Sequence, residues 1–162
     1  MTPAQYNHCV KEYADGVFRY IVKNLKDRDE AQNIVQNTFE KVWIKREDVI
    51  FEKAKSYIFT IAYREMIDAM RYKKKFTDME QINDEQFKTT NTNYTGVKAL
   101  VDKLVNKLPE NQKTVILLRD YEGHDYRTIG EITGMTEAQV KINLFRARQY
   151  LKECIGKLEV LI

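Results

Sequence analysis

Apolar residues recur at intervals of three and four along most of the chain, which is the spacing of helices that bury one face. The first predicted helix begins with Thr2 as N-cap, Pro3 in its first turn and Gln5 closing a capping box. Two more are predicted over residues 29–45 and 54–75. Since apolar and polar residues nowhere alternate for long, a sheet is not expected and the fold class is all-α.

The C-terminal part of the chain carries the clearest start and stop signals. A helix is expected to begin at Pro109 and to end at Gly123 in a left-handed cap. Asp125 caps a short helix, and Gly134 allows a tight turn before a longer helix that begins with the capping box of Thr136 and Gln139. Two helices joined by a short glycine turn form a helix-turn-helix pattern. The pattern alone leaves two alternatives: a DNA-reading unit, or a helical hairpin with a solvated basic face.

The net charge of +3 hides an uneven distribution along the chain. Residues 1–76 hold 15 Lys and Arg against 11 Asp and Glu, whereas residues 77–98 are acidic and rich in Thr, Asn and Gln. Such a polar stretch buries too little surface to order itself. We therefore expect two small helical domains, residues 1–76 and 99–162, joined by an acidic flexible linker, residues 77–98, with a helical turn near residues 78–87.

No arrangement of side chains in the sequence suggests catalysis. The two histidines, His8 and His124, lack metal-ligand spacing, and His124 beside Asp125 is expected in a solvated turn. Cys9 and Cys154 lie far apart and without ligand spacing. An enzyme, a metal site and a cofactor are therefore not expected. The absence of a signal or a spanning segment predicts a cytoplasmic protein with reduced thiols.

The C-terminal 45 residues resemble region 4 of the extracytoplasmic-function (ECF) group of sigma-70 family sigma factors. The matching positions are Leu108-Pro109, Leu117-Leu118-Arg119-Asp120, Glu122-Gly123, Tyr126, Ile129, Gly134, Val140-Lys141 and Arg146-Ala147-Arg148. The resemblance implies that the helix over residues 136–150 reads the −35 promoter element. The residues it implies for −35 DNA are Arg119, Arg127, Thr136, Glu137, Lys141, Ile142, Phe145, Arg146 and Arg148.

Residues 29–43 are similar to the helix of sigma region 2 that docks on core RNA polymerase. Val35-Gln36 and the segment from Phe39 to Trp43 match the pattern. The residues implied for polymerase contact are Gln32, Asn33, Gln36, Asn37 and Glu40. Gln32-Asn33 stands where the family commonly has Glu-Asp, which suggests a contact based more on hydrogen bonds than on charge. Without the resemblance, these side chains would be taken as an exposed polar face.

The third helix resembles the family's −10 element. Tyr57 and Phe59 stand where the family carries aromatic residues, and aromatic faces stack on unpaired bases. Phe59 is expected to be exposed, whereas core packing and base stacking are equally plausible for Tyr57. Four cations within residues 71–75 indicate a patch that contacts phosphates. The residues implied for −10 DNA are Phe51, Lys53, Tyr57, Phe59, Arg64, Arg71, Lys73, Lys74 and Lys75.

Together these matches predict an alternative sigma factor. The resemblance implies core RNA polymerase, promoter DNA and an anti-sigma factor as partners, without direct insertion into a membrane. Two alternatives come from other classes of protein. One is a stand-alone helix-turn-helix regulator, which leaves residues 29–43 unexplained, and the other is a helical adaptor that does not bind DNA.

Overall fold

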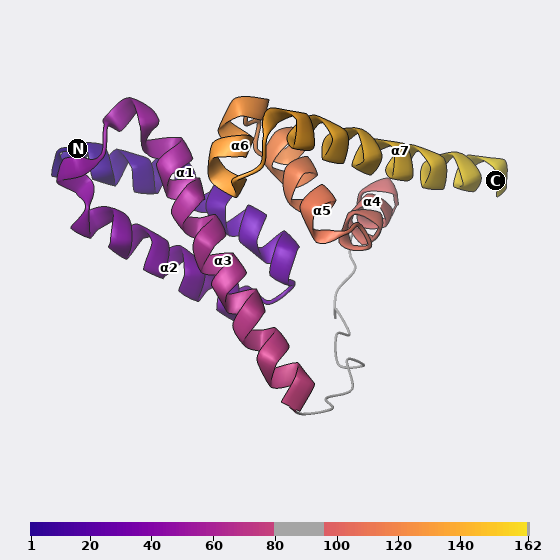
Figure 1. The fold of residues 1–162 in the computed structure, drawn as a ribbon, viewed down its shortest axis with the longest axis horizontal. Coiled ribbons are helices and arrows are strands. Elements are labelled where there is room, and N and C mark those ends of the chain that lie inside the picture. The colour runs from indigo at the N-terminus through magenta and orange to yellow at the C-terminus, as the bar shows by residue number, and fades with distance from the viewer. Residues whose placement is uncertain (80–95, 162) are drawn as a thin grey trace.

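The computed structural model describes residues 1–79 and 96–161, which form helices and no strand (Figure 1). Three long helices form a first bundle, and four further helices with an intervening π-helical turn form a second bundle, so the predicted all-α class is confirmed. The first bundle comprises α1 (Pro3–Leu25), α2 (Arg28–Ile44), two 3₁₀ turns (Arg46–Asp48 and Phe51–Lys53) and α3 (Ala54–Met79). The second comprises α4 (Val97–Asn106), α5 (Glu110–Ile116), the π-helical turn η4 (Leu117–Tyr121), α6 (Tyr126–Thr133) and α7 (Glu137–Leu161).

Side chains cap the starts of α1 and α2. The Thr2 hydroxyl accepts from the Gln5 amide at 3.1 Å, and the Gln5 side chain accepts from the Thr2 amide at 2.9 Å, so the capping box of α1 is confirmed. At the start of α2, an Asp27 carboxylate oxygen accepts from the Glu30 amide at 3.1 Å. Each of these bonds satisfies an N–H group that the first turn of a helix leaves without a partner.

The helix-turn-helix also has the caps and glycine conformations that its sequence predicts. Asp125 accepts from the Thr128 amide at 2.7 Å and caps α6, and Gly134 ends that helix with φ of 81°. The second capping box is present too, with the Gln139 amide 3.1 Å from the Thr136 hydroxyl. Gly123 has φ of 77°, which confirms its predicted left-handed conformation.

The structure differs from the predicted elements at two places. Helix α3 continues to Met79, past the predicted end at Lys75, so the start of the predicted linker is helical. Helix α4 was not predicted, although Val97, Leu100, Val101, Leu104 and Val105 have helical spacing. Residues 80–95 of the predicted linker, with most of the turn predicted near residues 78–87, lie outside the described residues, and the last two linker residues already belong to α4.

The two bundles pack against each other, with α6 beside α3 (Figure 1). Tyr20 of α1 is fully buried, and its hydroxyl lies 3.5 Å from the Thr114 hydroxyl of α5. The Lys113 ammonium group donates at 3.0 Å to the Asn24 carbonyl, at the C-terminal end of α1. Buried apolar residues of both bundles therefore form one continuous core.

Burial has a chemical consequence for Lys113, a charged residue that is only 8% exposed. Desolvation, reinforced by the nearby Lys26 charge and partly offset by Glu110, lowers its pKa to about 8. A lysine that is buried and charged must donate to a good acceptor. The carbonyl of Asn24 supplies one, because the last carbonyls of a helix lack partners within it.

Candidate nucleic-acid and polymerase surfaces

The polar face of α2 is a continuous exposed row. The opposite face of α2 is formed by the buried residues Ala31, Ile34, Thr38 and Val42. At helical spacing this leaves two neighbouring columns of side chains facing solvent. The exposed residues are Gln32, Asn33, Gln36, Asn37 and Glu40, and we call them the α2 polar row. The structure brings all five predicted polymerase contacts together on one face.

The C-terminal end of α2 carries an exposed aromatic side chain that the sequence analysis did not assign to a site. Trp43 is partly exposed, and the Arg46 guanidinium lies 3.8 Å from its ring centroid. The Tyr6 ring meets the Trp43 ring edge-on, with centroids 4.9 Å apart. These contacts hold the indole at the boundary between α2 and the 3₁₀ turn.

The predicted −10 residues near the start of α3 differ in exposure. Lys53 is exposed, whereas Phe51 is half-buried beside the His8 ring at a centroid distance of 5.8 Å. Tyr57 is half-buried against the core, an intermediate position between the two roles considered for it. Farther along α3, the basic residues Arg64, Arg71, Lys73, Lys74 and Lys75 are exposed.

Phe59 contradicts the expectation that it is exposed. Its side chain is 1% exposed, with its ring centroid 6.0 Å from that of Tyr20 and 4.5 Å from that of His124. The expectation was wrong because it took only the neighbours along the chain into account. The second bundle, far away in sequence, covers this side of α3.

His124 also contradicts its expectation of a solvated turn position. The residue is 4% exposed and meets the Phe59 ring edge-on, at an interplanar angle of 73°. Desolvation, reinforced by the Lys55 charge and partly opposed by Asp125, lowers the pKa of His124 to about 4. His124 is buried because the second bundle packs against α3 at Phe59, a contact that local sequence does not encode.

The N-terminal half of α7 presents the predicted −35 residues. Val140, Leu144 and Ala147 are buried, so the remaining sides of the helix face outward. Phe145 is 62% exposed and Ile142 is 42% exposed, which is unusual for apolar side chains on a folded surface. The other exposed members of the predicted set on this helix and its N-cap are Thr136, Glu137, Lys141, Arg146 and Arg148.

Three arginines of the predicted −35 set have contacts within the second bundle. Arg119 donates to the His124 carbonyl at 3.0 Å, and Arg148 makes two bonds to the Asp120 carboxylate, at 2.6 and 3.2 Å. Arg127 lies 3.6 Å from Glu131. In this arrangement Arg119 and Arg148 brace η4 and the turn after it, whereas the Arg127 side chain stays 82% exposed. Lys141 and Arg146 are exposed on the outward face of α7.

Comparison with known proteins identifies the family. Residues 9–76 match the model of sigma-70 region 2, and residues 98–151 match that of sigma-70, region 4. The ECF RNA polymerase sigma factor SigM of Bacillus subtilis is 27% identical over 144 residues, covering 86% of this chain and 88% of SigM. The RNA polymerase sigma factor SigV of the same organism is 30% identical over 145 residues, covering 89% of this chain and 87% of SigV. The chain is an ECF sigma factor of the sigma-70 family.

The fold of this sigma factor is shared with solved structures. The sigma factor RpoE in complex with the anti-sigma factor NepR from Bartonella quintana has a TM-score of 0.80 at 22% identity, over 93% of this chain and 96% of that one. CnrH in complex with the cytosolic domain of CnrY gives 0.68 at 17% identity, over 94% and 88%. Sigma factors of this family are DNA-binding regulators of transcription. This one acts as an alternative sigma factor that binds core RNA polymerase and promoter DNA and directs transcription initiation.

The described part of the chain contains neither a cluster of metal ligands nor a membrane-spanning helix. Within residues 1–79 and 96–161, no three His, Cys, Asp or Glu side chains lie together as metal ligands would. Among the helices in that same part of the sigma factor, none is both long and apolar enough to cross a membrane.

Proposed function

We propose that the sigma factor divides its work between the two bundles: residues 1–76 bind core polymerase and the −10 element, residues 77–98 link the two units, and residues 99–162 bind the −35 element. The supporting observation is that each bundle exposes a different chemistry. The first presents the α2 polar row and a basic helix end, and the second presents the outward face of α7. Run-off transcription with core polymerase on a pool of random upstream sequences tests the assignment. A failure to bind core polymerase would favour a stand-alone DNA-binding regulator.

The α2 polar row is proposed to hold core polymerase mainly by hydrogen bonds. Replacing Asn33 and Gln36 with alanine is expected to weaken core binding about 30-fold, because each neutral hydrogen bond contributes about 1 kcal/mol and two are lost. Titration of core polymerase against the labelled variant measures this loss. As a matched control, alanine at the exposed amides Asn7 and Asn111 should leave the affinity unchanged. Equal losses in both double variants would contradict the assignment of this face.

The exposed lysines near the end of α3 are proposed to follow the phosphates of the −10 region. Replacing Lys73, Lys74 and Lys75 with glutamine should reduce the slope of log affinity against log salt by about 2, because each phosphate contact to single-stranded DNA contributes about 0.7. Open-complex formation across a range of salt concentrations gives the slope. The control removes three lysines elsewhere, at Lys11, Lys103 and Lys107. An unchanged slope in the Lys73–75 variant would show that this patch does not face DNA.

The regulation of the sigma factor is proposed to include an anti-sigma partner. Two solved relatives in fold were crystallised or described as complexes of this kind, one with NepR and one with the cytosolic domain of CnrY. Affinity purification of the full chain from cells, with and without the inducing condition, would identify the partner by its loss on induction.

The sigma factor is further proposed to act in the cytoplasm, where RNA polymerase works, and to have no catalytic activity of its own.

A further inference from the structure

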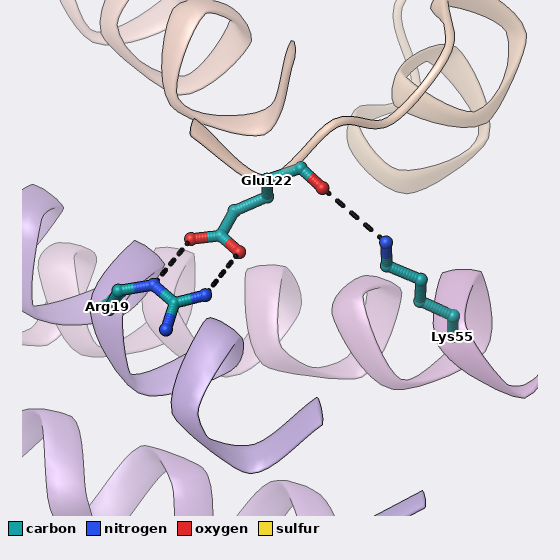
Figure 2. Close-up of polar contacts among 3 residues, drawn as sticks. All are labelled: Arg19, Lys55 and Glu122. Atoms are coloured by element: carbon teal, nitrogen blue, oxygen red, sulfur yellow. Dashed lines mark hydrogen bonds and ion pairs between the residues drawn. The ribbon is translucent and has the colours of Figure 1, made fainter. Parts of the chain in front are cut away.

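The turn between η4 and α6 is seated on the first bundle by charged contacts (Figure 2). The Glu122 carboxylate accepts two bonds from the Arg19 guanidinium of α1, from Nε at 3.3 Å and from Nη2 at 3.2 Å. The Glu122 carbonyl accepts from the Lys55 ammonium group of α3 at 3.5 Å. One residue of the second bundle thus bridges two helices of the first. We call residues 122–124 the interbundle turn.

The surface of α1 leaves room for this carboxylate. Gly16 lies one helical turn before Arg19, and a Cβ atom at Gly16 would come within 2.8 Å of Glu122 Oε2. Glycine in the middle of a helix costs up to about 1 kcal/mol relative to alanine. Here it admits the side chain that pairs with Arg19. The Glu122 side chain is accordingly only 7% exposed.

The other end of the interbundle turn places the His124 ring in a buried position where a positive charge on the ring would be unfavourable. His124 Nε2 is buried and has no hydrogen-bond partner among the described residues. Phe59 of α3 contacts the ring, the charges that act on it are Lys55 of α3 and Asp125 of its own bundle, and Arg119 donates to the backbone carbonyl of His124. An imidazolium ion would bury an unpaired N–H donor close to the Lys55 ammonium group, and burying such a group costs free energy. This buried position therefore favours the neutral form of the His124 ring.

We propose that the interbundle turn is a proton-controlled latch, which holds the two bundles together while His124 is neutral and releases them when His124 takes up a proton. Release would uncover Phe59, which the closed arrangement hides. The consequence for DNA rests on the proposed −10 role of Phe59. The latch itself concerns only the contact between the bundles, so it can be tested without DNA or polymerase.

The direction of the pH response follows from the two protonation equilibria. An exposed histidine has a pKa near 6.5, whereas burial at the latch lowers the pKa of His124 to about 4. The closed form therefore binds fewer protons than the open form, so it is favoured above pH 6.5 and loses ground as the pH falls toward 4. Between pH 7.5 and 5.5 the ratio of closed to open molecules is expected to fall about tenfold.

Two other titratable groups at the contact must be separated from His124. The pKa of Lys113 is lowered to about 8 by burial, so Lys113 stays mostly charged between pH 7.5 and 5.5 and adds little to the response in this range. The Glu122 carboxylate is the other ionisable group, and it pairs with Arg19. A Glu122→Gln variant removes its charge and keeps His124.

The test follows the distance between the bundles in the full chain. A donor and an acceptor fluorophore are attached to cysteines introduced at the exposed positions Asn7 and Gln149, with Cys154 replaced by serine. Energy transfer is recorded from pH 7.5 to 5.5. The expected result is an increase in the open fraction that corresponds to the tenfold change in ratio. An unchanged distance distribution would overturn the proposal.

Variants assign the response to one group. His124→Phe keeps a ring beside Phe59 and cannot take up a proton, so it is expected to remain closed throughout this range. Glu122→Gln should open more easily at every pH but retain the tenfold response. A response that persists in His124→Phe or disappears in Glu122→Gln would overturn the proposal.

An unmodified chain offers an independent measurement. The pH dependence of the His124 ring signal in NMR is expected to give a pKa close to 4, and the spectrum contains only one other histidine, His8. A pKa near 6.5 for His124 would overturn the latch even if every variant folded poorly.

Discussion

Alanine at both Lys141 and Arg146 is expected to lower transcription from a −35-dependent promoter about 30-fold while leaving the affinity for core polymerase unchanged. Both cations are exposed on the N-terminal half of α7, and five residues of separation place them about 140° apart around the helix axis. They therefore flank the outward face, where a helix in the major groove meets a base edge and the neighbouring phosphates. Losing about 1 kcal/mol at each of two contacts gives this factor.

The measurement is run-off transcription, with core binding titrated in parallel. The matched control is alanine at Lys152 and Lys157, which removes the same charge from exposed positions farther along α7. The control is expected to retain most of the activity, because these lysines lie in the C-terminal half of α7, and such a helix enters the groove by its N-terminus. If the two double variants lost activity equally, general charge and not the α7 face would be responsible. A parallel loss of core binding would point to misfolding of the second bundle.

The second large effect is expected from Phe59→Ala, which should lower the free energy of unfolding of the full chain by about 3 kcal/mol. Its side chain is 1% exposed and touches Tyr20 in the first bundle and His124 in the second. Truncation removes contacts on both sides and leaves a cavity between the bundles. For a chain of this size, the corresponding decrease in Tm is about 9 °C.

Phe145→Ala makes the same chemical change at a residue that is 62% exposed, so its cost should stay within about 0.5 kcal/mol. Urea unfolding followed by circular dichroism compares the two variants. Because Phe59 joins the bundles, its loss should also separate their unfolding transitions. Equal stabilities of the two variants would mean that the bundles do not pack over Phe59 in solution.

Local signals in the sequence were enough to predict most helices and the helix-turn-helix. The capping boxes at Thr2 and Thr136 and the left-handed Gly134 depend on residues no more than four positions apart, so a short window contains all the physics they need. The polar row of α2 was predictable for the same reason, since exposed and buried faces of one helix differ in composition.

The contact between the bundles was not predictable in this way. His124 was expected in solvent and Phe59 on the surface, yet each buries the other across 65 positions of sequence. Lysine is usually a surface residue, but Lys113 is covered where the bundles pack together, and its ammonium group donates to the Asn24 carbonyl at the end of α1. Tertiary packing decides the environment of such residues, and no periodicity within one helix reports on it. The roles assigned to the DNA-facing and polymerase-facing side chains rest on the family and stay predictions.

The bond from Lys113 to the Asn24 carbonyl can form only after α5 has been synthesised. The ribosome makes α1, α2 and α3 first, and domains generally fold from the N-terminus at about 5–20 residues per second. For a few seconds the nascent first bundle has neither Lys113 at the end of α1 nor a cover over Phe59. Every newly made molecule therefore passes through a stage in which Phe59 is uncovered. During those seconds a partner that binds the first bundle at the ribosome meets no competition from the second bundle, which has not yet been translated.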